Sequence, residues 1–153
     1  MNNFILKTTE DLTPFIQEVI GKGQSLKITV TGNSMFPLFS HMRDTVTLKQ
    51  ASHYKKYDII LYQRSNGELV LHRIVKKKGE VFFLCGDNQT MQEHPIYPDQ
   101  VIARVTEFTR KGKNRSVSHA LYRLYSFFWC LNLPLRKPVL LFALKLRRWF
   151  LEK

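Results

Sequence analysis

The chain of 153 residues has only two cysteines, Cys85 and Cys130, far apart and without a pairing pattern. Two such thiols argue against a disulfide scaffold and fit a reducing compartment or two structural thiols. The five histidines are scattered, with no C-x-x-C and no H-x-x-x-H spacing. We therefore expect no metal site and no cofactor.

Long hydrophobic runs are also missing. No window reaches about 18 uninterrupted apolar residues, so the sequence predicts no confident membrane span. The first residues, "MNNFILKTTEDL", hold one lysine and a very short apolar run. A secretory signal peptide needs a longer apolar region, so none is expected here.

Acidic residues are scarce, with 12 Asp and Glu against 24 Lys and Arg, for a net charge of +12. The imbalance is concentrated in residues 110–153, which carry 11 basic residues against one acid, Glu152. Residues 1–109 carry 13 basic and 11 acidic residues and are nearly neutral. Nucleic acid is an unlikely partner for this basic tail, because no base-reading motif occurs and the apolar content is high.

Six short runs of β-branched or aromatic residues follow a period of two, with turn signals such as "SNG" and "KKKGE" between them. They predict a mostly β fold, a curled antiparallel sheet or partial barrel. A short N-terminal helix is expected after the capping Thr13, with Pro14 in its first turn and Gly21 past its end. The expected strands are Leu26–Val30, Thr45–Leu48, Ile59–Gln63, Leu69–Val75, Val81–Cys85 and Val101–Phe108.

These patterns divide the chain into three parts. Residues 1–24 form the helical segment, 25–109 a β domain, and 110–153 a basic amphipathic tail that begins with a linker at 110–115. Because the body is nearly neutral and the tail is basic, we expect the body to fold without the tail.

The segment "VTGNSMFPLF" places Ser34 at the end of a predicted strand, just after Gly32. A serine hydroxyl is a poor nucleophile unless a base lies within hydrogen-bond reach. His72, in "LVLHRIV", is a candidate base, and it shares one strand face with Val70 and Ile74. Partial burial there would lower its pKa and keep it neutral, as a base must be.

Four segments, in order, resemble the boxes of type I signal peptidases and the related self-cleaving repressor proteases. They are "GNSMFP", "HRIV", "CGDNQ" and "DQVIARV", and they cover about two-thirds of the chain. His72 before Arg73 makes the chain similar to the His-base branch, that of endoplasmic-reticulum and spore-former enzymes. The resemblance implies a serine endopeptidase with Ser34 as nucleophile and His72 as general base.

The resemblance leaves the third catalytic member open. In the His branch a second acidic residue, about six positions after the aspartate of the Gly-Asp-Asn box, orients the histidine, and that position here is Glu93. Asp87 is the other candidate. The family's Gly-Asp pairs are replaced by Arg43–Asp44 and Tyr57–Asp58, so the local turns are expected to differ.

The resemblance also implies an extended peptide substrate with small residues before the cut, bound by strand addition along a sheet edge. The substrate-binding candidates belong to the serine box: Gly32, Asn33, Met35 and Pro37. Met35 would line the cleft or simply pack the turn, and Pro37 would fix the turn. The amide of Ser34 is the natural oxyanion donor, and a second donor is left open.

The tail has the composition of helices that lie in a membrane interface, with Trp129, Trp149 and many basic residues. Ser116, His119, Arg123 and Ser126 are expected to form one polar stripe, and a second helix is expected after Pro138. We expect peripheral binding to anionic lipid through residues 110–153. Packing on the body, which would favour a cytoplasmic protein, and binding to a partner protein stay open.

The sequence therefore favours a serine endopeptidase that removes a leader or signal peptide. The alternative is a peptidase-like binding or regulatory module with little turnover, which the longer Glu93 and the lack of a membrane anchor support. A self-cleaving repressor is a weaker idea, because only about 25 residues precede the protease boxes.

Overall fold

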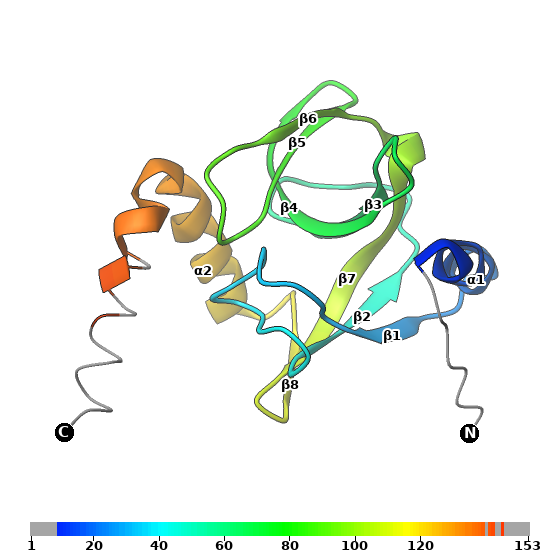
Figure 1. Cartoon of the computed structure of the whole chain (residues 1–153), viewed down its shortest axis with the longest axis horizontal. Helices are drawn as coiled ribbons and strands as arrows, with labels where there is room; N and C mark the ends of the chain where they lie inside the picture. Colours follow the sequence, from blue (N-terminus) through cyan, green and yellow to red (C-terminus); the bar gives the residue numbers. More distant parts are fainter. Residues whose placement is uncertain (1–8, 140, 143–144, 146–153) are drawn as a thin grey trace.

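The computed structural model of the chain describes residues 9–139, 141–142 and 145. Eight antiparallel strands form one open, curled sheet in the order β1-β2-β7-β3-β4-β5-β6, with β8 paired to β7 (Figure 1). The mostly β fold class is therefore confirmed. The strands are β1 Leu26–Thr29, β2 Thr45–Lys49, β3 Ile59–Gln63, β4 Leu69–Lys78, β5 Val81–Cys85, β6 Glu93–Ile96, β7 Val101–Arg110 and β8 Lys113–Ser116.

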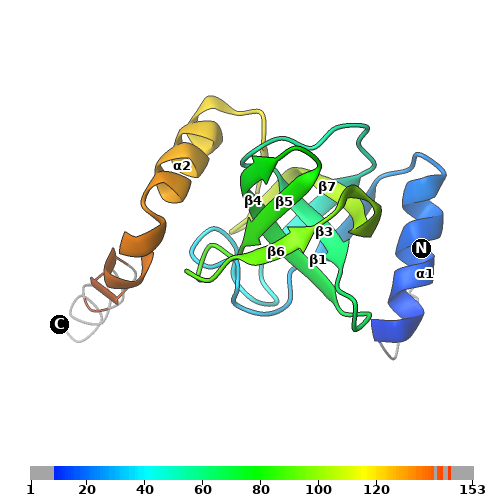
Figure 2. The same ribbon diagram turned by 90° about the horizontal axis from the view of Figure 1, so that it is seen from above.

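Two helices lie on opposite sides of the sheet, as both views show (Figures 1 and 2). They are α1, Thr9–Gly21, and α2, Ala120–Leu131, and the short 3₁₀ turns are Pro98–Gln100 and Leu133–Leu135. Residues 136–139, 141–142 and 145 are also helical.

The N-terminal helix begins at Thr9, four residues before the expected cap, and Pro14 lies inside it. The prediction took Thr13 as the cap and Pro14 as the first turn, so the start of the helix was placed too late. On the buried face, Ile16 and Ile20 enter the core.

The core consists of two main apolar clusters. One joins α1, the loop after β1 and the strands β2, β3 and β7, and it includes Ile16, Phe39 and Val46. The other lies among β3, β4, β5 and β6 and includes Ile60, Ile74 and Phe82. Each such side chain stabilises the fold by roughly 1.5–3 kcal/mol when fully buried, so the sheet is a firm support for residues placed along it.

Two strands were not predicted. β6 includes Pro95 and lacks alternation, but it is the end strand of the sheet, where a missing N–H is tolerated. β8 was expected to be part of a basic linker. It pairs with β7 across a two-residue turn in which Lys111 and Gly112 have φ of 50° and 75°, as a type I′ hairpin requires.

The two cysteines are free, buried and part of one small cluster with Val75. Burial raises the pKa of Cys85 to about 11 and also raises the pKa of Cys130. Both thiols are therefore protonated and unreactive at neutral pH. Their surroundings fit the expectation of two structural thiols.

Candidate active site

His72 lies in the middle of β4 and pairs with Ile60 of β3. As the alternation predicts, Val70, His72 and Ile74 point to one buried face, and the imidazole is 1% exposed. Burial lowers the pKa of His72 to about 4, against the opposing effect of the Glu93 carboxylate. The imidazole is therefore neutral at pH 7.

Two polar residues lie beside Nδ1 of His72. Oε1 of Glu93 lies 3.3 Å from Nδ1, and the Tyr62 hydroxyl lies 3.4 Å from it. The Tyr62 hydroxyl donates its own hydrogen to Glu93 Oε2 at 2.7 Å. Both groups can therefore only accept from His72, which favours the tautomer with hydrogen on Nδ1 and leaves the Nε2 lone pair as the basic site.

Glu93 is held in place by Arg64, whose Nε donates to Glu93 Oε2 at 2.8 Å and whose second nitrogen pairs with Oε1. Burial opposes ionisation of Glu93, but the hydrogen bonds from Arg64 and Tyr62 outweigh it and lower the pKa of the carboxyl. An ionised Glu93 therefore faces the Nδ1–H of the buried histidine.

Ser34 lies in the turn that follows β1. Gly32 adopts a φ of 78°, a conformation that favours glycine, and its amide donates to Nδ1 of His41 at 2.9 Å. Within the part of the chain that the structure describes, no hydrogen bond uses the amide of Ser34. That N–H is available to a ligand.

The Gly-Asp-Asn box supports this turn from behind. The amide of Asn88 donates to the Ser34 carbonyl at 2.8 Å. A Cβ added to Gly86 would lie 2.6 Å from the same carbonyl oxygen and 2.9 Å from Oε1 of Gln89. Glycine at position 86 thus lets the two loops approach, which places Ser34.

Ser34 and His72 line one open cleft of about 340 Å³. Gly32, Asn33 and Met35 border it as well, although the Met35 side chain is 2% exposed and packs in the core. Pro37 is half-buried on the same loop and is not one of the lining residues. Arg64, Glu68 and Gln89 complete the polar part of the cleft.

The cleft runs along an open stretch of β4. β5 pairs with β4 only from Arg73 to Lys78. β3 pairs with β4 from Leu69, which lies opposite Gln63, to Arg73, which lies opposite Ile59. Among the described strands, Leu69, Val70 and Leu71 therefore have a neighbour on one side only. These three residues line the cleft and leave room for an added strand.

Asp87 takes a different place from Glu93. Its carboxylate binds Arg73 through two hydrogen bonds, from Nε at 2.9 Å and Nη2 at 2.7 Å, and both side chains are fully buried. Arg73 is the residue after His72, but its side chain points to the other face of β4. Asp87 thus anchors β4 on the side opposite the cleft.

The tail helix completes this buried pair. Nη1 of Arg73 donates to Ser126 Oγ at 2.8 Å and to the Tyr122 hydroxyl at 3.0 Å. The Tyr125 hydroxyl donates to Asp87 at 3.3 Å, and the Trp129 indole donates to the Asp87 carbonyl at 3.1 Å. Trp129 therefore packs on the body through its polar edge.

Arg136, which follows α2, adds to the contact between the tail and the body. It is 1% exposed, and its Nη1 donates to the carbonyls of Gly86 at 3.0 Å and Gln89 at 3.3 Å. Residues 120–136 therefore pack on the body, which was one of the alternatives for the tail. The expectation that the body folds without the tail, and the division at residue 109, both stay predictions.

Two expectations for the tail are wrong. Ser126 is buried against Arg73 whereas Arg123 is exposed, so the predicted polar stripe is split between two environments. Pro138 lies within the helical residues 136–139 rather than before them. Trp149 and the rest of the second apolar face beyond residue 145 lie outside the described residues.

Tyr62, Arg64, His41 and Arg136 were missed by the sequence reasoning. The first two lie at period-two spacing on β3 and its extension, on the side that faces His72, so strand alternation is a usable signal for them. His41 and Arg136 act through loop contacts that no periodicity predicts. Tyr57 stands where a glycine was expected and keeps a glycine-like φ of 81°, so the turn is preserved there.

Within the described residues, no group of His, Cys, Asp and Glu side chains is arranged to hold a metal ion. The helices in that part of the chain are all too short or too polar to cross a membrane.

The cleft therefore holds a serine and a buried, neutral histidine, the two residue types that serine nucleophile chemistry needs. The model of the peptidase S24-like family matches residues 2–106, well over half of the chain, so the chain belongs to the peptidase S24-like family. A comparison with curated proteins gives no match.

Proposed function

We propose that this protein is a serine endopeptidase similar to signal peptidases, which cleaves a leader or signal peptide after small residues. The observation that carries the proposal is the neutral His72, whose Nδ1 faces Glu93 while Ser34 lies on the same cleft. Ser34 is the nucleophile, His72 the general base, and Glu93 the residue that orients the imidazole.

The chemical steps follow from this assignment. Ser34 Oγ attacks the scissile carbonyl while His72 Nε2 takes the hydroxyl proton. The Ser34 amide, which is free of other partners in the described residues, stabilises the oxyanion. The C–N bond then breaks as Nε2 returns the proton to the leaving amine, and a water molecule hydrolyses the acyl ester by the same route.

The substrate class rests on the open stretch of β4. An extended peptide can hydrogen-bond to the backbone of Leu69–Leu71 and pass Ser34 on the opposite wall of the cleft. Main-chain pairing gives affinity for an extended segment without reading its sequence. Gly32 and Asn33 beside Ser34 leave space next to the scissile bond.

The test compares protein N-termini in cells that carry the wild type or Ser34→Ala. New N-termini that follow small residues, present only with the wild type, would support a leader or signal peptidase. Identical sets of N-termini would favour the alternative, a binding or regulatory module with the fold of a peptidase. The chain's own cleavage products, if they are the only difference, would indicate self-cleavage.

Glu93→Gln is expected to reduce turnover strongly, because an amide no longer favours the imidazolium that forms during attack. Loss of the carboxylate also removes the interaction that raises the pKa of His72, so the acid limb of kcat/KM should move below its wild-type position near pH 4. The pH profile of peptide hydrolysis measures both effects.

The matched control for Glu93→Gln is Glu80→Gln, which removes an exposed carboxylate from the turn between β4 and β5, outside the cleft. It should leave turnover near that of the wild type. Thermal unfolding of both variants should stay close to the wild type at pH 7. Equal losses of activity in the two variants would refute the assignment of Glu93 as the orienting residue.

A further inference from the structure

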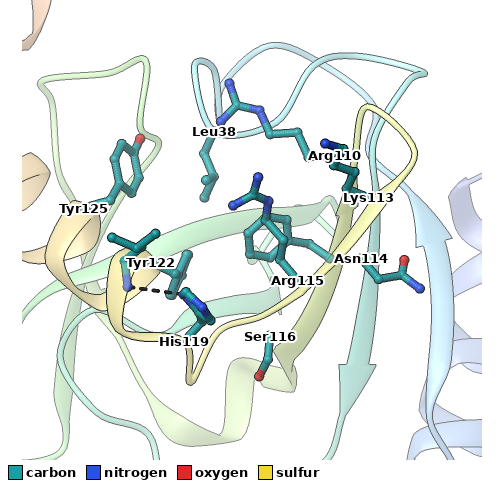
Figure 3. Close-up of a pocket in the computed structure, with 11 residues that line it drawn as sticks. Leu38, Arg110, Lys113, Asn114, Arg115, Ser116, His119, Tyr122 and Tyr125 are labelled. Atoms are coloured by element: carbon teal, nitrogen blue, oxygen red, sulfur yellow. Dashed lines mark hydrogen bonds between the residues drawn. The ribbon is translucent and has the colours of Figure 1, made fainter.

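A second pocket lies between the β7–β8 hairpin and α2. It is also bordered by the loop between β1 and β2 that carries Ser34, called the serine loop below. It has a volume of about 500 Å³, and Figure 3 shows its lining side chains. Leu38 comes from the serine loop, Phe108 from β7, and Tyr122 and Tyr125 from α2. These side chains make an apolar floor and wall.

The hairpin supplies the pocket with three cations. Arg110 pairs with Lys113 and Phe108 with Arg115, so these four side chains share one face of the hairpin. Glu107, Thr109, Asn114 and Ser116 fall on the other face, where Thr109 bonds to Asn114. In Figure 3 the side chains of Asn114 and Ser116 point away from Arg110 and Arg115.

These cations have no acidic counterpart. No carboxylate lines the pocket, and no salt bridge involves Arg110, Lys113 or Arg115 in the part of the chain that the structure describes. Three unneutralised cations on one small face create a positive potential that favours an anionic ligand.

An exposed apolar stripe begins at the same pocket. Leu121 lines the pocket and is 65% exposed, and Leu124, Phe128 and Leu131 continue from it at helical spacing along the outer face of α2. The opposite face of α2 is the one that packs on Arg73 and Asp87. The outer face therefore has no partner within the described residues.

We propose that this surface binds an anionic membrane, with a phosphate headgroup held by Arg110, Lys113 and Arg115 and the apolar stripe of α2 in the membrane interface. The three cations and the neighbouring apolar stripe together decide between candidate partners. A nucleic acid or an acidic protein would satisfy the cations but leave the leucine and phenylalanine stripe in water, whereas a lipid surface satisfies both.

The experiment measures co-sedimentation of the full chain with vesicles of phosphatidylcholine alone or mixed with phosphatidylglycerol. The variant carries Arg110→Gln, Lys113→Gln and Arg115→Gln. The matched control carries Lys76→Gln, Lys77→Gln and Lys78→Gln, which removes the same charge from the exposed end of β4. Both sets lie outside the cleft.

The full chain should bind the phosphatidylglycerol vesicles, less so as salt rises because screening weakens the electrostatic share. At roughly 1 kcal/mol per basic residue near the surface, the pocket variant should bind about 100-fold more weakly. The control should lose a few-fold at most. Soluble glycerol phosphate should compete poorly, because it lacks the apolar part of the ligand.

Equal losses in the two triple variants would reduce the effect to net charge and overturn the proposal. Equal binding to the two kinds of vesicle would overturn it as well, since no headgroup would then be recognised. Full competition by glycerol phosphate would assign the pocket to a free anion. None of these readouts depends on proteolysis, so they stand apart from the proposed peptidase activity.

Discussion

Ser34→Ala and His72→Ala are each expected to abolish cleavage of an extended peptide, with losses of several orders of magnitude. The two residues act as one proton-transfer unit, so the loss of either should cost about as much as the loss of both. Steady-state hydrolysis of a peptide with alanine before the cut, by the full chain, measures the effect.

The two variants differ in what they do to the fold. Ser34 lies half-buried in a turn, so Ser34→Ala should unfold close to the wild-type temperature. His72 is fully buried, and His72→Ala leaves a cavity, so His72→Gln is the better comparison for stability. Wild-type turnover in either His72 variant, with the protein folded, would refute the dyad.

Asp87→Ala is expected to destabilise the protein by about 3–5 kcal/mol, because it leaves the buried Arg73 guanidinium without its counter-charge. Activity should fall with it, since Arg73 follows His72 on β4 and residues on either side of Asp87 support the Ser34 turn. Urea unfolding of the full chain measures the change in the free energy of unfolding.

Two further variants separate the cost of leaving a buried charge unpaired from a general loss of stability. Glu18→Ala removes the partner of Lys22 in an exposed ion pair and should leave stability near that of the wild type. The double variant Arg73→Met with Asp87→Leu removes both charges and should be more stable than Asp87→Ala alone. Wild-type stability of Asp87→Ala with activity lost would mean that Asp87 acts catalytically, contrary to the present assignment.

Burial of neutral His72 contributes to the loss of stability in acid. Its pKa is about 6.5 in the unfolded chain and about 4 in the folded protein. Between these values the unfolded chain binds the extra proton, so this residue's contribution to stability is full above pH 6.5 and falls as the pH drops toward 4. Activity measured below pH 6 should therefore be compared at temperatures well below unfolding.

Much of the fold was predictable because the body follows simple periodicity. β3 and β5 have the predicted bounds, and the face shared by Val70, His72 and Ile74 is buried as alternation required. β8 was missed because its four residues are all polar, and pairing with β7 rather than burial makes it a strand.

The candidate site was predictable only in part. The motifs placed Ser34 and His72 on one cleft, but they left Glu93 and Asp87 as equal candidates. Long-range contacts distinguish the two carboxylates. Glu93 reaches His72 from β6, whereas Asp87 binds Arg73 beneath α2. The tail's composition indicated helices that lie in a membrane interface. Only the structure reveals that the face of α2 toward the body bears Ser126 and the tyrosines.

The most direct test of the central assignment is mass spectrometry of the full chain, quenched with acid during turnover of the alanine peptide. The account predicts a peptide acyl group attached to Ser34 in the wild type. It also predicts that Glu93→Gln lowers the rate of acylation and that Ser34→Ala carries no adduct. An adduct on another residue, or cleavage by Ser34→Ala at the wild-type rate, would contradict it.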